Sequence, residues 1–261
     1  MSGVIDAANF LEGIKVRVDS VEAYDPPERV RRYDADMDIM HPLRLKMIDV
    51  ALELLPFDST DALRVLDLGV GTGAFSRQLM EKYLNAEVVA VDGAASMLEL
   101  AKFRLREYSH RVKWVVSDFR AMPAELLEPD TIDVVISSYA LHHLNTQEKL
   151  AVLKSVVRAI RPGGWILNAD LVIADAPDVE QRIQEIRVEA ITGRAPANDS
   201  RFCSPEATRQ YLDELEEMEQ DQPQTLKQDI HILCESGITN AEVFWKELRE
   251  AVTGGSKANA T

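Results

Sequence analysis

Three alternating glycines after a short apolar run constrain the fold more than any other feature of this sequence. Residues 64–75 read RVLDLGVGTGAF, which predicts a buried strand, a turn containing Gly69, Gly71 and Gly73, and then a helix. Glycine permits positive φ angles and lets a ligand approach the backbone closely. The first turn of the helix presents free N–H groups at the same place. The segment therefore predicts a ligand site at the end of a strand.

An acidic residue at the end of the next predicted strand indicates the kind of ligand. Asp92 directly follows the predicted strand 87–91 and lies about twenty residues after the glycines. This is the spacing of a carboxylate that hydrogen-bonds a ribose. We therefore expect a cofactor that contains a nucleoside.

Asp67, two residues before the first glycine, distinguishes between two such cofactors. The run from Gly69 to Ala74 also fits a loose dinucleotide pattern, but a carboxylate beside a pyrophosphate would repel it. S-adenosylmethionine has no phosphate, and its ammonium and sulfonium groups are positive, so a carboxylate suits it. The sequence predicts S-adenosylmethionine as the cofactor, with S-adenosylhomocysteine as the product, and Asp67 disfavours an NAD-dependent reductase.

Strands and helices alternate through the middle of the chain. This order predicts a parallel sheet with helices on both faces, and a short connection between two final strands predicts an antiparallel hairpin. The expected strands are 64–68, 87–91, 112–116, 132–137, 165–172, 241–245 and 248–253. The expected fold class is α/β, with a Rossmann-like, seven-stranded, mostly parallel sheet.

Further segments surround this core. The two predicted helices of the N-terminal segment, near 27–35 and over 42–55, are candidates for a lid. The acidic residues of the helical segment 178–222 predict a solvated helix face; they are Asp213, Glu214, Glu216, Glu217, Glu219 and Asp221. The expected organisation is a lid (1–60), a cofactor-binding core (61–175), a helical insertion or cap (176–223), and a C-terminal helix and hairpin that complete the core (224–261).

Five motifs occur in the order found in one known family. They are 65–73, 89–98, 116–119, 133–144 and 158–165. Together they resemble the class I, Rossmann-like S-adenosylmethionine-dependent methyltransferases of the small-molecule type. The resemblance implies that Asp92 holds the ribose, that the third motif contacts the adenine, and that lid tyrosines close over the site. The implied cofactor-binding residues are Asp67, Gly69, Gly71, Gly73, Asp92, Gly93, Met97, Asp118, Phe119, Ser137, Tyr24 and Tyr33.

Candidate catalytic residues follow the fourth strand. Methyl transfer from a sulfonium is an in-line displacement in which the protein aligns the reactants and excludes water. A general base is needed only where the acceptor must lose a proton. His143 and His142 are candidates for that base or for orienting the acceptor, and Tyr139 is a candidate pocket residue. Each could instead have an ordinary packing role. The sequence predicts no metal site.

The acceptor is predicted to be a small molecule. The run 137–140 reads SSYA and departs from the Asp/Asn-Pro-Pro-Tyr/Phe pattern of enzymes that methylate planar nitrogens, whereas the run 140–144, ALHHL, resembles small-molecule and quinone-type methyltransferases. The formal net charge of −15 argues against a large nucleic-acid interface. The alternatives are a tRNA wobble-uridine modifying methyltransferase and a catalytically silent, cofactor-binding regulatory protein. A homodimer is a further option.

The expected compartment is the cytoplasm. Cys203 and Cys234 form no disulfide or metal pattern, and residues 1–6 lack the basic start and apolar run of a signal peptide. We find no apolar stretch near the roughly 20 residues that span a bilayer, so no membrane partner is expected.

Overall fold

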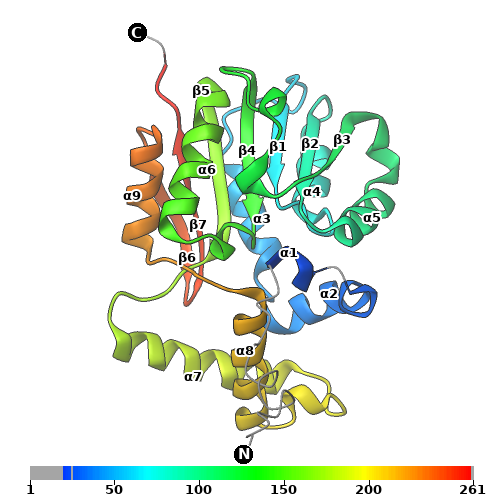
Figure 1. The fold of residues 1–261 in the computed structure, drawn as a ribbon, viewed down its shortest axis with the longest axis vertical. Helices are drawn as coiled ribbons and strands as arrows, with labels where there is room; N and C mark the ends of the chain where they lie inside the picture. The colour runs from blue at the N-terminus through cyan, green and yellow to red at the C-terminus, as the bar shows by residue number, and fades with distance from the viewer. Residues whose placement is uncertain (1–19, 25, 260–261) are drawn as a thin grey trace, which may run out of the picture.

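Seven strands form one sheet in the order β3-β2-β1-β4-β5-β7-β6 (Figure 1). The strands are β1 (Arg64–Leu68), β2 (Glu87–Asp92), β3 (Val112–Val116), β4 (Ile132–Ser138), β5 (Ile160–Leu171), β6 (Glu242–Glu247) and β7 (Glu250–Ser256). β1 to β5 pair in parallel, and β7 runs antiparallel to both β5 and β6. The predicted mostly parallel sheet with a C-terminal hairpin is confirmed. A computed structural model describes residues 20–24 and 26–259; the start of the predicted lid, including the segment inspected for a signal peptide, lies outside them.

Helices cover both faces of the sheet because successive strand side chains point to opposite sides. Val65 packs into a core beneath one set of helices, and Leu66 packs into a second core beneath the other. The first set is α3 (Arg44–Glu53), α4 (Ala74–Lys82) and α5 (Ala95–Arg104), and the second is α6 (Thr146–Ala159) and α9 (Leu226–Ser236). Near-continuous apolar runs such as 132–136 are therefore buried from both sides.

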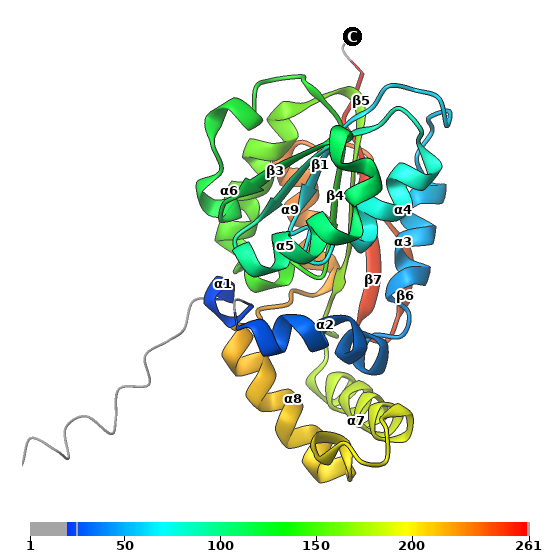
Figure 2. The ribbon, with the colours of Figure 1, turned by 90° about the vertical axis from the view of Figure 1, so that its right-hand side faces the viewer.

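The remaining α-helices form a cap beyond the carboxyl ends of the strands (Figure 2). They are α1 (Ser20–Ala23), α2 (Pro27–Met40), α7 (Pro177–Arg194) and α8 (Pro205–Glu219). Ile191 and Leu212, from α7 and α8, are fully buried in a separate small core against Met40 of α2. The predicted lid and the predicted insertion thus pack together, although strands β1 to β5 lie between them in the sequence.

Short 3₁₀ segments connect several of these elements. They are η1 (Arg106–Arg111), η2 (Phe119–Ala121), η3 (Ala124–Leu126), η4 (Leu141–His143) and η5 (Ser200–Phe202). Within the part of the chain that the structure describes, no helix has the length and apolar character to cross a membrane.

Several predicted strand boundaries differ from the observed ones: the turn of the C-terminal hairpin lies at 248–249, between β6 and β7, and the largest difference is at the start of β5. We expected a turn at residues 162–164 and a strand from 165, but β5 begins at Ile160. Gly163 donates its N–H to the carbonyl of Lys257, and the Lys257 N–H is bonded to the Gly164 carbonyl, so the C-terminal segment pairs with this stretch. The irregularity that suggested a turn is a register shift between β4 and β5.

Candidate active site

The glycine loop between β1 and α4 is held against the end of β2. The N–H groups of Gly69 and Val70 both donate to the carbonyl of Val91, at 2.9 and 3.0 Å. Gly69 and Gly71 have φ angles of 73° and 53°. A Cβ on Gly69 would lie 2.4 Å from the Ala140 Cβ, whereas one on Gly71 would meet nothing closer than a carbonyl oxygen at 4.0 Å. The side of Gly71 that lacks a side chain therefore faces open space.

Asp92 ties the loop to the start of α5. Its carboxylate accepts hydrogen bonds from the N–H of Gly71 at 2.8 Å and from the N–H of Ala94 at 2.9 Å. Burial raises the pKa of Asp92, and these two hydrogen bonds oppose that rise. Asp92 lines the cavity below the glycine loop, in the position expected of a ribose-binding carboxylate.

Asp67 is the most deeply buried acidic group of this region, with 1% of its surface exposed. The Ser76 hydroxyl donates to its carboxylate at 2.6 Å. Burial raises the pKa of Asp67 to about 7, the Ser76 hydrogen bond opposes the rise, and nearby Asp92 adds to it. Since Asp67 borders the same cavity, a positive group bound there would favour its ionised form.

We call this first cavity the glycine-loop cavity. All but two of the predicted cofactor-binding residues line it; these are Asp67, Gly69, Gly71, Asp92, Gly93, Met97, Asp118, Phe119, Tyr24 and Tyr33. Gly73 packs against α5 instead, where a Cβ would lie 3.1 Å from the Leu105 Cδ1. Ser137 is buried and donates to the carbonyl of Leu68 at 2.8 Å, while Ser138 lines the cavity. Ser138, and not Ser137, therefore borders the cavity, and Gly73 packs against the helix beside it.

A second cavity, the cap cavity, lies between the sheet and α2, α7 and α8. Tyr24, Tyr33 and Tyr139 line both cavities and so mark their junction. His143 borders the glycine-loop cavity, and His142 borders the cap cavity. The three predicted catalytic residues thus lie where the two cavities meet.

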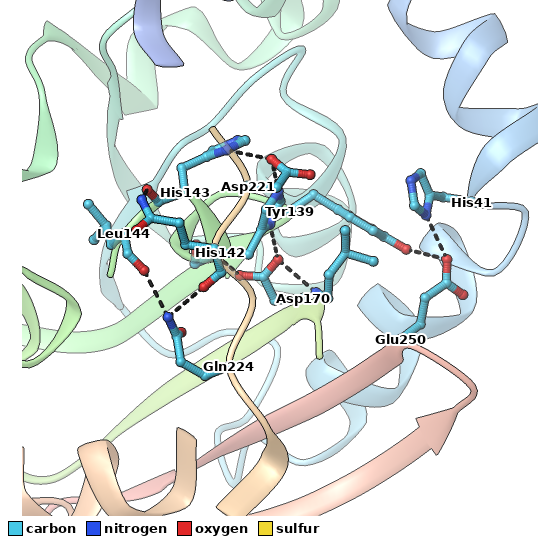
Figure 3. A network of polar contacts seen from close by, with 12 residues as sticks. His41, Tyr139, His142, His143, Leu144, Asp170, Asp221, Gln224 and Glu250 are labelled. Atoms are coloured by element: carbon cyan, nitrogen blue, oxygen red, sulfur yellow. Dashed lines mark hydrogen bonds and ion pairs between the residues drawn. The ribbon is translucent and has the colours of Figure 1, made fainter. Parts of the chain in front are cut away.

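The two histidines share a carboxylate and differ in their surroundings (Figure 3). His142 lies between Asp170, at 2.6 Å from its Nδ1, and Asp221, at 3.4 Å from its Nε2. His143 approaches Asp221 at 3.0 Å with Nδ1 and the Tyr24 hydroxyl at 3.3 Å with Nε2. Burial would lower the pKa of His142, but the two carboxylates raise it to about 10. Burial and positive His142 lower the pKa of His143.

Tyr139 is held in an uncommon backbone conformation, with a φ angle of 48°. Its hydroxyl donates to Glu250 Oε1 at 2.8 Å, and His41 Nδ1 lies 3.0 Å from the same oxygen. Burial, together with the Glu250 charge, raises the pKa of Tyr139 well above its usual value. Tyr139 is therefore a rigid, neutral wall between the cavities.

Helix α2 of the predicted lid is attached to the glycine loop through Asp34. The Asp34 carboxylate accepts from the Thr72 hydroxyl at 2.9 Å and from the Arg44 guanidinium at 3.2 Å, and it also pairs with Arg104. One carboxylate thus fixes α2 to the loop, to α3 and to α5.

The sequence did not predict several polar groups of this site, and the expectation of a solvated face was wrong for part of the acidic segment. Asp221 faces the histidines, Glu219 is buried against Arg29, and Glu216 pairs with Arg187 at 2.6 Å. The expectation of a solvated face fails for these residues because α8 lies against the cap cavity. Asp170 near the end of β5 could have been found by the rule that located Asp92, since both are carboxylates at strand ends.

Comparison with known sequences agrees with this geometry. Residues 65–164 match the family model described as a methyltransferase domain. An uncharacterized methyltransferase of Geobacillus kaustophilus is 34% identical over 123 residues, which is 47% of this chain and 54% of that protein. Demethylmenaquinone methyltransferase of Lactococcus lactis is 34% identical over 107 residues, 40% of each chain. The chain spans about half the length of the curated relatives it matches.

Comparison with solved structures extends the likeness to the whole fold. Phosphoethanolamine N-methyltransferase 2 of Haemonchus contortus, solved with phosphomonomethylethanolamine and S-adenosylhomocysteine, matches with a TM-score of 0.65 and 16% identity, over 93% of this chain and 61% of that one. The matched family region ends before α7 and α8, so the cap cavity lies largely outside it.

Proposed function

We propose that the chain is a class I S-adenosylmethionine-dependent methyltransferase and that it methylates a small molecule held in the cap cavity. The observation that carries the proposal is the junction of two cavities at Tyr24, Tyr33 and Tyr139. In-line displacement needs the acceptor atom, the methyl carbon and the sulfur on one line. A cofactor on one side of the tyrosines and an acceptor on the other meet that requirement.

The residues of the glycine-loop cavity suit each part of the cofactor. Asp92 accepts hydrogen bonds on one side of the cavity, where a ribose diol would donate, and Phe119 offers an apolar surface for the adenine. Asp67 faces the positive methionine portion. When bound there, S-adenosylmethionine supplies the methyl group and a thioether leaving group. The protein then has to orient the acceptor and exclude water.

The cap cavity combines apolar and charged lining, which suits an amphipathic acceptor. Met37, Met40 and Leu171 form apolar parts of its wall. Arg29 and Arg187 line it too, each paired with a glutamate of α8. The names of two similar proteins, a demethylmenaquinone methyltransferase and a phosphoethanolamine N-methyltransferase, support a small acceptor.

Two other functions receive less support. The formal net charge of −15 disfavours a tRNA substrate. A silent regulatory protein would not require a second cavity behind the tyrosines, so the cap cavity favours turnover.

Filling the cap cavity should stop methyl transfer while leaving cofactor binding intact. In Met40→Trp the larger side chain would occupy acceptor space, and we expect turnover to fall at least about tenfold, with the cofactor Kd within about twofold of wild type. Panels of phenols, carboxylic acids and amines are screened for S-adenosylhomocysteine formation by mass spectrometry, and calorimetry gives the Kd.

Leu84→Trp provides the matched control, because Leu84 is 58% exposed on the surface and lines neither cavity. It should retain wild-type turnover. If Met40→Trp turned over the same acceptor at the wild-type rate, the acceptor would have to bind elsewhere.

A further inference from the structure

Three buried ligand atoms from two distant segments converge at the junction of the cavities. One ligand atom from each of His142, His143 and Asp221 lies within 4.8 Å of the other two, and Asp221 faces His142 Nε2 and His143 Nδ1. The histidines follow β4 in η4, while Asp221 follows α8. We propose that His142, His143 and Asp221 bind a divalent transition-metal ion such as Zn²⁺. The sequence predicts no such site, because the carboxylate that completes the cluster is far from the histidines along the chain.

The separations of the Asp221 carboxylate from the two histidine nitrogens are those of ligands around one ion. Asp221 Oδ1 lies 3.0 Å from His143 Nδ1 and 3.4 Å from His142 Nε2. Two ligands that are each about 2.1 Å from a metal lie about 3.0 Å apart at a right angle and about 3.4 Å apart at the tetrahedral angle. Two imidazoles and a carboxylate are also a donor set that zinc and iron accept.

Two of these atoms make no hydrogen bond within the described part of the chain. His143 Nδ1 and Asp221 Oδ1 are buried and have no hydrogen-bond partner among the residues that the structure describes. Their approach at 3.0 Å is close, but it is not aligned as a hydrogen bond. Buried polar groups are rarely left this way, and an ion between them would satisfy both.

The opposite ring nitrogen of each histidine already has a partner. His142 Nδ1 lies 2.6 Å from Asp170 Oδ1, and His143 Nε2 lies 3.3 Å from the Tyr24 hydroxyl. With those nitrogens donating, a metal ion would bind the nitrogen of each ring that faces Asp221, and at His142 it would displace the proton that the two carboxylates hold there in its absence. Metal-bound histidines are usually oriented by such partners, most often a carboxylate.

Backbone contacts hold the two segments together without the ion. The N–H of Gln222 donates to the His142 carbonyl at 2.8 Å, and the Gln222 side chain donates to the His143 carbonyl at 3.2 Å. Asp221 is therefore anchored by its neighbour beside both histidines. The site is preorganised, which favours binding by a chain that is already folded.

The position of the site suggests a role, which rests on the function proposed above. His142 and Asp221 line the cap cavity, so a free coordination position could take an oxygen or nitrogen atom of the acceptor. The bound acceptor would release its proton to solvent more readily. Its electron pair would then form the bond to the methyl carbon, and the pair of the broken carbon–sulfur bond would remain on sulfur.

Direct metal binding tests the site independently of methyl transfer. The chain is stripped with a chelator and titrated with Co²⁺, followed by visible absorption, and with Zn²⁺, followed by calorimetry. We expect one ion per chain and a higher melting temperature with metal. Asp170→Asn keeps all three ligands and should weaken binding about 10- to 100-fold, and His143→Ala and Asp221→Ala should weaken it further.

His231→Ala serves as the control, because His231 is exposed on α9 and should not affect binding. The proposal is overturned if the wild-type chain takes up no ion, or if His143→Ala and Asp221→Ala bind Co²⁺ as wild type does. The wild-type titration decides even if a variant fails to fold. Metal uptake is measured without cofactor or acceptor, whereas methyl transfer is judged by S-adenosylhomocysteine formation, so the two proposals fail separately.

Discussion

Replacing Gly71 with valine is expected to raise the Kd for S-adenosylmethionine more than about 100-fold, a loss of about 2.7 kcal/mol of binding free energy. A Cβ at Gly71 would meet no protein atom closer than 4.0 Å, so the new side chain would extend into the glycine-loop cavity. It would block the backbone surface that the cofactor approaches. Calorimetry measures the Kd, and thermal unfolding verifies that the variant is folded.

Two other glycines provide the comparison for this variant. The φ angle of 53° at Gly71 should cost about 1–2 kcal/mol of stability for any larger residue, so a moderate fall in Tm is expected. Gly69→Ala should lose more stability, because its Cβ would lie 2.4 Å from that of Ala140. Gly193→Val, at an exposed position with nothing within 4 Å, should bind the cofactor normally. If folded Gly71→Val bound the cofactor with wild-type affinity, the cofactor could not bind in this cavity.

Cofactor affinity should increase steeply with pH below neutrality. The pKa of Asp67 is raised to about 7 by burial, so this group is mostly protonated in the unliganded chain at pH 5 to 6. A positive cofactor prefers the ionised carboxylate, and each binding event below that pKa must first release a proton. The Kd should therefore fall up to about tenfold per pH unit between about pH 5 and 7, and then level off.

Asp67→Asn separates this effect from other titrations, including that of Asp92, whose pKa is also raised. The amide keeps the size of the side chain and carries no charge. The variant should bind weakly at pH 7.5, with a much flatter pH dependence. Calorimetry in buffers of different ionisation enthalpy should also detect fewer released protons. A wild-type pH profile in Asp67→Asn would contradict the assignment.

Cofactor affinity should rise with pH, whereas the stability of the unliganded chain should fall. A pKa that is higher in the folded state than in the unfolded state stabilises the protein below the unfolded pKa, and the benefit disappears as pH rises through the folded pKa. For Asp67 the window runs from about pH 4 to about pH 7, and the free energy of unfolding should fall by up to about 4 kcal/mol across it. Urea unfolding of wild type and Asp67→Asn, compared at each pH, isolates this contribution.

Local patterns predicted the sheet and the glycine-loop cavity. Asp67 and Asp92 lie in the last residues of β1 and β2, and Gly71 follows β1. Parallel strands bring their carboxyl ends to one edge of the sheet. The period of two in a strand explains why Ser137 does not border the cavity. That side chain points into the sheet layer toward Leu68, and the next residue, Ser138, faces the cavity.

The polar partners of the site could not be predicted because they come from distant segments. One strand and three α-helices separate Asp221 from the histidines that it contacts, and Asp34 of α2 contacts Thr72 of the glycine loop. The sequence does not distinguish an exposed carboxylate of a charged helix from a buried one, because packing against distant segments decides which is buried. Glu219 shows this, since it is buried against Arg29 among exposed neighbours.

A crystal structure with S-adenosylhomocysteine tests the central claim most directly. The account predicts the ribose at Asp92, the amino group on the Asp67 side of the glycine-loop cavity, and the sulfur directed past Tyr24 and Tyr139 toward the cap cavity. A cofactor whose sulfur faces away from those tyrosines, or one bound outside the glycine-loop cavity, would contradict it.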